Sequence, residues 1–139
     1  MKILTSKHLF TLIHGYRTKI RSAINAKALN INAMHIQCLR FIAQTEHCTA
    51  NGIVQGLARD KSQISIIIKD MVSKGWIKKA ENITDKRSQL LLLTNTGQEL
   101  FDKVQREEAA INKRMMQGLS AQELAAFEAS ITTMIKNLQ

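Results

Sequence analysis

The stretch from residue 60 to residue 93 constrains the fold most, because it changes from helical to extended periodicity within one run. Five apolar residues recur there at i, i+3, i+4, i+7 and i+8, which predicts a helix with one buried face: Ile64, Ile67, Ile68, Met71 and Val72. The outward face is then mostly small, polar and cationic, with Ser62, Ile66, Lys69, Asp70 and Ser73. After Gly75, short extended segments at 76–81 and 89–93 flank a polar loop at 82–88. This order predicts a helix followed by a hairpin with a basic tip, the outline of a winged helix.

Four short motifs lie in and beside this stretch. They are Asp60-Lys61-Ser62-Gln63-Ile64-Ser65, Lys74-Gly75-Trp76-Ile77, Asp85-Lys86-Arg87 and Leu93-Thr94-Asn95-Thr96-Gly97. In this order and at this spacing they resemble the MarR family of bacterial transcription regulators. The resemblance runs from about residue 32 to residue 138 and is sharpest over 49–100. It implies a mainly α fold: a winged helix-turn-helix with a two-stranded β wing, plus N- and C-terminal helices that form a dimerisation layer.

Composition and charge agree with a helical protein that has a polyanionic partner. The chain has 139 residues, enough for one domain with its own core, and it lacks proline, which suits long helices. The net charge is +9. Residues 1–30 carry six Lys or Arg and no acid, and residues 60–90 carry seven against four acids, whereas 91–139 is nearly balanced. The positive charge is therefore concentrated at the amino end and in the helix-wing unit, as expected of a nucleic-acid footprint.

Cysteine content and hydropathy predict a cytoplasmic protein without a membrane partner. The two cysteines, Cys38 and Cys48, do not make a disulfide framework, and no segment resembles a signal peptide or a membrane span. An organellar transit peptide is an alternative interpretation of the acid-poor start. A folded amphipathic helix explains it better.

Helices are also predicted outside the 60–93 stretch. We expect them over 7–29, over 33–44 behind the cap Asn32, over 49–59, from 94 to about 117, and after a capping box formed by Ser120 and Glu123. We interpret 1–139 as one domain. Within it, 7–29 and 96–139 are the dimerisation helices and 32–94 is the DNA-binding region, roles that the family resemblance implies. For 7–29, an ordinary surface helix and a helix lying on a membrane are the alternatives.

The helix predicted over 49–59 departs from the family. Gly52 and Gly56 lie inside it, where each costs roughly 0.5–1 kcal/mol relative to alanine, and Ala58-Arg59 replaces the usual glycine and apolar residue at the turn. These departures predict a less rigid helix-turn-helix.

Candidate DNA contacts lie on the second helix of the motif, at 60–74, and on the wing. Cations would bind phosphates, and short or forked polar side chains near the start of the helix would bind base edges, with Gln63 suited to adenine. The free amides at that end would also favour a phosphate. The candidates are Lys61, Ser62, Gln63, Ser65, Ile66 and Lys69 on the helix, and Lys78, Lys79, Asp85, Lys86 and Arg87 on the wing. A solvated lysine-rich face is the alternative.

Three of these candidates carry sharper expectations. Ile66 stands where family members commonly carry Arg, so it can contact a thymine methyl group but cannot hydrogen-bond guanine, which predicts an A·T-rich site. Packing of Ile66 on the wing or a neighbouring helix is the alternative. Asp85 and Arg87 match the family's Asp-x-Arg. The carboxylate would hold the guanidinium extended for a narrow minor groove. A surface pair without function is the alternative.

Other chemistry has little support in the sequence. His35 and Cys38 are spaced i, i+3, but no third metal ligand with suitable spacing follows, so a core thiol beside a surface imidazole is the better interpretation. We see no catalytic motif and expect neither an enzyme nor a cofactor or metal requirement. Some MarR-family members sense oxidants through a cysteine in the first helix, but that helix lacks cysteine here, so this route is disfavoured. A different oxidant-sensing role for Cys38 is the alternative.

The sequence therefore predicts a homodimeric transcription regulator that binds a pseudo-palindromic duplex. Resemblance implies a small-molecule effector, often an aromatic acid or a drug-like compound, bound where the helices predicted over 7–29, over 33–44 and from 94 to about 117 meet the winged helix. Repression is the default expectation, and the sequence does not decide between repression and activation. The alternatives are a non-specific architectural or interaction module, and an effector-binding relative that has lost DNA binding.

Overall fold

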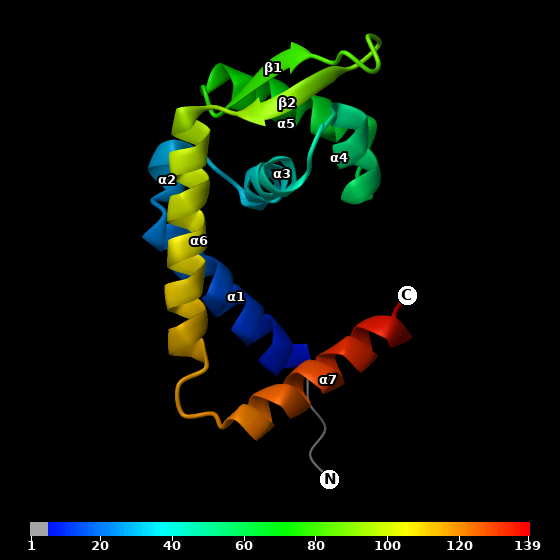
Figure 1. Ribbon diagram of the computed structural model, residues 1–139. Coiled ribbons are helices and arrows are strands. Elements are labelled where there is room, and N and C mark those ends of the chain that lie inside the picture. Colours follow the sequence, from blue (N-terminus) through cyan, green and yellow to red (C-terminus); the bar gives the residue numbers. More distant parts are fainter. Residues whose placement is uncertain (1–5) are drawn as a thin grey trace.

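The computed structural model describes residues 6–139. Lys2, counted above in the basic amino-terminal segment, lies outside the described residues. The elements follow in the order α1 (Ser6–Ala23), α2 (Ala26–Leu29), α3 (Ala33–Gln44), α4 (Ala50–Gly56), α5 (Lys61–Ser73), β1 (Ile77–Glu81), β2 (Gln89–Leu93), α6 (Asn95–Met115) and α7 (Ala121–Asn137). Figure 1 shows the wing at one end of the molecule and α7 crossing the other end, with α6 running between them. The predicted mainly α, winged helix-turn-helix fold is confirmed.

The core lies around α3. Its residues Cys38, Leu39 and Ile42 are buried together with side chains from α1, α4, α5, α6 and the wing. The core of the winged helix is therefore continuous with the amino-terminal helices.

Two predicted caps are formed: the Asn32 side chain accepts the Met34 and His35 amides, and Ser120 and Glu123 form the capping box of α7.

The first helix differs from the prediction. Residues 7–29 form two helices, because Asn25 adopts a left-handed conformation with φ of 56° and separates α1 from α2. Asn30 is also left-handed and ends α2. Asparagine tolerates this conformation better than most residues. Ile24, Ala26 and Ile31, which lie around this break, are buried.

The helix-turn-helix is shorter than predicted on its first side. Thr49 caps α4 by accepting the Gly52 amide, and the helix ends at Gly56 rather than at Arg59. The turn that follows places Ala58 at φ of 50°, where the family's usual glycine would be unstrained. Asp60 then caps α5. The departure at Ala58 therefore falls on the one turn position that favours glycine.

The wing is an antiparallel ribbon that pairs Ile77 with Leu93 and Glu81 with Gln89. An isolated bridge between Thr49 and Leu90, and a hydrogen bond from the Leu91 amide to the Cys48 carbonyl, attach β2 to the start of α4. These contacts fix the wing beside the helix-turn-helix.

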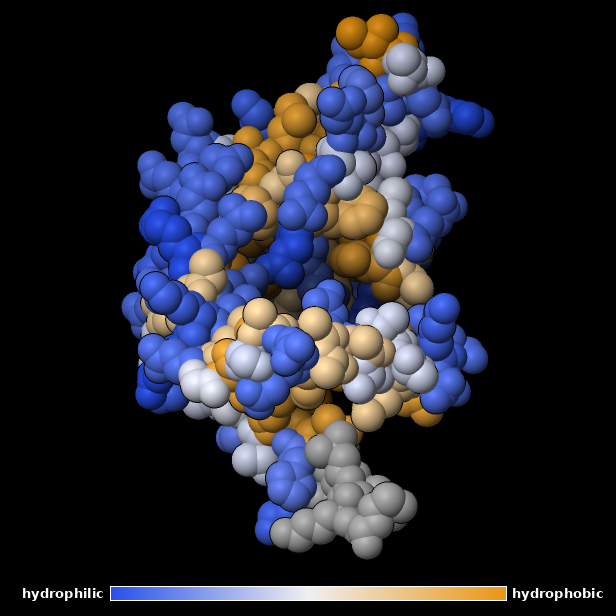
Figure 2. Space-filling view, turned by 60° about the horizontal axis from the view of Figure 1, so that its bottom comes forward, coloured by the Kyte–Doolittle hydropathy of each residue, from blue (hydrophilic) through white to orange (hydrophobic). Residues whose placement is uncertain are grey.

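The C-terminal helix packs little on its own chain. No residue of α7 is buried, and apolar side chains of α1, the end of α6 and α7 are exposed: Phe10, Leu12, Ile13, Met115, Met116, Leu119, Phe127, Met134, Ile135 and Leu138. Figure 2 views this end of the molecule, where apolar side chains cluster. Among residues 6–139, no helix has both the length and the apolar character needed to cross a membrane.

Candidate nucleic-acid interface

Helix α5 presents its polar face to solvent because its apolar stripe is buried against the rest of the domain. Ile64, Ile68 and Met71 are buried, whereas every α5 candidate for DNA contact is exposed. Ile66 has an exposed fraction of 68%, so the alternative that it packs within the chain is wrong. Val72, predicted to face inward, is exposed as well.

The amino end of α5 is less open than predicted. The Asp60 carboxylate accepts a hydrogen bond from the Ser62 hydroxyl at 2.8 Å and lies 3.5 Å from the Ser62 amide. A phosphate at this end would have to displace the Asp60 carboxylate or share the Ser62 hydroxyl and amide with it. The side chains of Gln63 and Ser65 make no such contact and are exposed.

The tip of the wing is built by Asn82, which the sequence analysis did not single out. Its buried side chain accepts the Thr84 and Asp85 amides and the Thr84 hydroxyl, and donates to the Ser88 hydroxyl. An asparagine that bonds the backbone two residues ahead is a common turn signal. Asn82 therefore holds the loop that carries Asp85 and Arg87.

The Asp85–Arg87 pair has the predicted geometry. One Asp85 carboxylate oxygen accepts both the Arg87 amide and Nε of its guanidinium at 3.1 Å. The two hydrogen bonds from Arg87 lower the pKa of Asp85. The Arg87 side chain is 92% exposed, so its remaining donors face solvent.

A groove of about 360 Å³ lies between α4, α5 and the wing. It brings together five of the predicted residues from three elements: Lys61, Ser65, Lys69, Lys79 and Arg87. The same groove is lined by Asn51, Ser88 and Gln89, which sequence reasoning missed. Gln89 could have been found from the register, because it pairs with Glu81, two residues after Lys79 on the same side of the ribbon.

The other candidates lie outside the groove. Lys78 pairs with Leu92, whereas Lys79 pairs with Leu91, and adjacent residues of a strand point to opposite faces. Lys78 therefore faces away from the groove that Lys79 lines. Ser62, Gln63 and Ile66 lie on the outer face of α5, and Asp85 and Lys86 lie in the wing loop.

His35 and Asp70 are not where the sequence analysis expected them. His35 is buried, with an exposed fraction of 4%, and not a surface imidazole. Its Nδ1 accepts the Asn32 amide, which leaves Nε2 to donate to Asp70 at 2.7 Å. The ring also meets Trp76 edge-on, with 5.6 Å between centroids. Asp70 is therefore turned toward α3 rather than outward.

A second hollow of about 570 Å³ lies between α1, α3, α6 and α7, at the end visible in Figure 2. Its wall is mainly apolar, with Ile13, Ile36, Met115, Phe127 and Ile131 among its residues. Three arginines also line it. Arg40 is paired with Glu108, whereas Arg17 and Arg21 have no acidic partner among residues 6–139.

Both cysteines are buried and free. Burial raises the pKa of Cys38 to about 11, with a smaller contribution from Cys48, and burial raises the pKa of Cys48 to about 11. Low thiolate content makes both poor nucleophiles at neutral pH. Within residues 6–139, no three His, Cys, Asp or Glu side chains are grouped as metal ligands.

The exposed helix α5, the wing beside it and the cationic groove between them define a winged helix-turn-helix protein. The sequence profile of the MarR family matches residues 29–88, which span α3 to the wing loop. Over this region the chain is similar to the MarR family of transcription regulators, the family that its motifs predicted. These proteins are regulators rather than enzymes.

Solved structures of similar proteins have the same fold. The chain is 22% identical to MepR of S. aureus in its complex with DNA, with a TM-score of 0.79, over 97% of this chain and 99% of that one. It is 23% identical to a SlyA-like transcription regulator from Listeria monocytogenes, with a TM-score of 0.76, over 99% and 90%. The reduced form of MarR from E. coli is 21% identical, with a TM-score of 0.74, over 96% and 98%. No curated protein sequence matches the chain.

Proposed function

We propose that the protein binds duplex DNA sequence-specifically through α5 and the wing. The observation that carries this proposal is the groove in which Lys61, Lys69, Lys79 and Arg87 converge from α5, β1 and the wing loop. Cations at this spacing bind phosphates, while the exposed outer face of α5, with Gln63 and Ile66, is free to meet base edges in the major groove. MepR, which shares the fold, has been crystallised with DNA.

We propose that Lys78 contributes less than the other predicted cations. It projects from the face of the wing opposite the groove. Asp85 acts by orienting Arg87, and Lys86 adds charge at the tip of the loop.

The functional unit is proposed to be a homodimer. Residues 7–29 and 96–139 would form the dimer layer, and 32–94 would form the DNA-binding region. Exposed apolar side chains on α1, the end of α6 and α7 support this assignment, because monomeric proteins rarely expose a contiguous apolar surface of this kind. A two-fold dimer would place two α5 helices about one DNA turn apart on a pseudo-palindromic site. Acting on chromosomal DNA would place the protein in the cytoplasm.

Regulation is proposed to follow from a small organic anion in the hollow between α1, α3, α6 and α7. Arg17 and Arg21 offer positive charge beside an apolar wall, and neither has an acidic partner in the described part of the chain, which suits an aromatic acid. Binding would relieve repression by favouring a dimer geometry that does not fit the site. No metal or cofactor enters this function.

Selection of binding sites from random duplex DNA with the purified protein tests the proposal. The expected result is a pseudo-palindrome whose binding survives mixed-sequence competitor with a specificity ratio of at least about 10³. Binding without a preferred sequence would instead support an architectural module. Absence of DNA binding would support a relative that retains only effector binding. Sedimentation of the same sample should give a dimer.

A further inference from the structure

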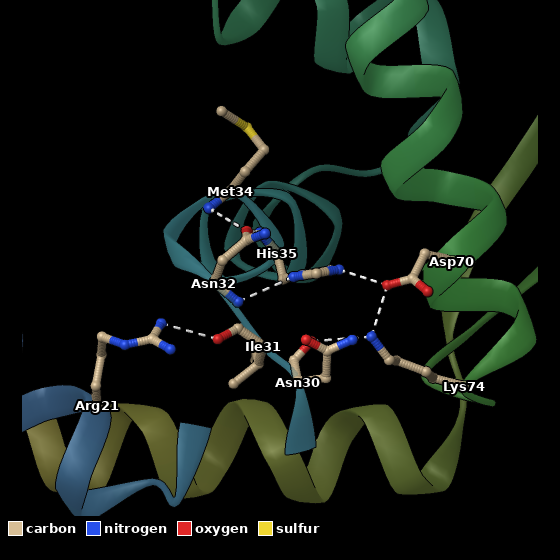
Figure 3. A network of polar contacts seen from close by, with 8 residues as sticks. All are labelled: Arg21, Asn30, Ile31, Asn32, Met34, His35, Asp70 and Lys74. Carbon is tan, nitrogen blue, oxygen red and sulfur yellow. Dashed lines mark hydrogen bonds and ion pairs between the residues drawn. The ribbon is translucent and has the colours of Figure 1, made fainter. Parts of the chain in front are cut away.

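The three-residue linker between α2 and α3 is bonded on both sides. On one side, the Arg21 guanidinium of α1 donates to the Ile31 carbonyl at 2.9 Å. On the other, Lys74 at the end of α5 donates to the Asn30 carbonyl at 2.9 Å. Figure 3 shows these contacts as parts of one network that runs from α1 to α5. The linker is thus the shared partner of a dimer-layer helix and the proposed DNA-reading helix.

A second path joins the linker to α5. The Asn32 amide donates to Nδ1 of His35, and Nε2 of the same ring donates to Asp70. Asp70 also accepts from Lys74 at 2.6 Å (Figure 3). Since Asp70 and Lys74 are one turn apart on α5, both paths fix the carboxyl-terminal half of that helix.

Arg21 is the member of this network that also lines the hollow. Its only hydrogen-bond partner among the described residues is a neutral carbonyl, that of Ile31. A carboxylate binds guanidinium through two charge-assisted hydrogen bonds, each roughly twice as strong as a neutral one. An organic anion in the hollow would therefore compete with the Ile31 carbonyl for Arg21.

We infer that Arg21 couples the hollow to the position of α5 through the linker. An aromatic carboxylate in the hollow takes the Arg21 guanidinium from Ile31, and the freed carbonyl must find water, because buried backbone acceptors do not remain unpaired. Residues 30–32 then shift, and the bonds from Asn30 to Lys74 and from Asn32 through His35 to Asp70 weaken together. The inference rests on the proposed function because it describes how the DNA-reading helix is regulated.

The experiment uses the full chain with 2-naphthoate as the probe and 2-naphthylmethanol, which lacks the charge, as the matched ligand. Binding is measured by calorimetry, and hydrogen exchange is measured at the amides of Asn32, Met34 and His35, all of which are bonded in the cap of α3. Naphthoate should bind and accelerate exchange at these amides and over 70–76, and the alcohol should do neither. These readouts need no DNA, so they remain informative where the proposed function fails.

Four variants separate binding from coupling. In Arg21→Gln, exchange at the cap of α3 should already be fast without ligand, and naphthoate should not change it further. Arg17→Gln is the matched control: Arg17 lies one turn earlier on α1 and lines the same hollow, but it has no bond to the linker. This variant should bind naphthoate more weakly and still respond at saturation. Lys74→Met should bind naphthoate as the native protein does but lose the response over 70–76, and Lys74→Arg should restore it.

With the selected DNA site, naphthoate should weaken binding of the native protein by at least about fivefold, the lower end of ordinary coupling between sites. In Lys74→Met, the logarithm of the fold change in DNA binding caused by naphthoate should be less than half of its value in the native protein. Failure of naphthoate to bind, exchange at the cap of α3 that naphthoate leaves unchanged, or full coupling in Lys74→Met or Arg21→Gln would each overturn the inference. If the native protein does not bind DNA but naphthoate still accelerates hydrogen exchange, only the proposed function is overturned.

Discussion

Gly56 of α4 lies directly against the ring of Phe41 in α3, so that a Cβ atom at position 56 would be 2.2 Å from Cε2 of that ring. This contact explains a glycine that helix propensity alone makes unfavourable. The absent side chain lets α4 approach α3 closely. Gly56 therefore sets the position of the first helix of the helix-turn-helix.

Gly56→Ala should destabilise the protein by about 1–3 kcal/mol, the usual range for an overpacked contact, despite the better helix propensity of alanine. Urea unfolding measures this difference. Gly15→Ala is the control, because a Cβ at position 15 meets nothing within 4 Å in the middle of α1. That variant should gain roughly 0.5–1 kcal/mol. Equal stability of Gly56→Ala and the native protein would show that the ring moves without cost.

The sequence predicted what depends on local periodicity and missed what depends on tertiary contacts. The spacing of Ile64, Ile68 and Met71 was enough to place α5 and its exposed face, because burial of one stripe determines the other. Nothing local distinguishes Gly56 as a packing residue, since Phe41 lies on another helix. Likewise, the burial of His35 follows from Asp70, 35 residues away.

The candidate site was predictable in part for the same reason. Motif positions identified Arg87 and the lysines of α5. Which face of the wing they share depends on strand register, which separates Lys79 from Lys78. Asn51 lines the groove because α4 packs beside β2, and no spacing within α4 could reveal this packing.

Arg87→Ala should weaken binding to the selected site by more than about tenfold at moderate salt and flatten the salt dependence by about one unit of slope. The unfolding free energy should hardly change, because the pair with Asp85 is exposed and such pairs contribute little to stability. Fluorescence anisotropy at several salt concentrations measures the first effect. Lys136→Ala, which removes a cation from α7, is the control. Similar losses in both variants would indicate that only net charge matters.

Ile66 should specify an A·T pair. The side chain is exposed on the outer face of α5 and has no hydrogen-bonding group, so it can contact a thymine methyl but cannot satisfy guanine. Site selection should return no required guanine beneath this position, and selection with Ile66→Arg should introduce one. A guanine required by the native protein at that position would contradict the assignment. Ile66→Ala should leave stability within about 0.5 kcal/mol, as for other exposed positions.

Cys38 and Cys48 should resist oxidation in the folded protein. Their burial and a pKa of about 11 leave little thiolate at neutral pH. Intact-mass measurement after mild peroxide treatment should show no added oxygen and no disulfide, whereas the same treatment in urea should modify both. Rapid modification of either thiol under native conditions would reveal an opening of the core around α3.

Stability should fall between neutral and mildly acidic pH because of His35. Its pKa is lowered from 6.5, first by burial and also by the charge of Lys74, and these effects outweigh the stabilising hydrogen bond and charge of Asp70. The unfolded chain therefore takes up a proton at a higher pH than the folded protein does, so stability is fully present above 6.5 and decreases as the pH falls from there toward the lower folded pKa. The lowered pKa of Asp70, due first to Lys74 and then to His35, acts in a separate range. Its contribution is complete above 3.8 and is lost only as the pH falls through its folded pKa.

His35→Gln tests this assignment, because glutamine cannot titrate but can still accept the Asn32 amide in the capping box. The native protein should lose more unfolding free energy than this variant between pH 7.5 and pH 5.5, measured by urea unfolding in one buffer system. His14→Gln, which removes an exposed imidazole from α1, should behave as the native protein does. The buried His35 ring can take up a proton only by losing the hydrogen bond from the Asn32 amide. Parallel pH profiles for the native and His35→Gln proteins would therefore show that another group causes the loss of stability in acid.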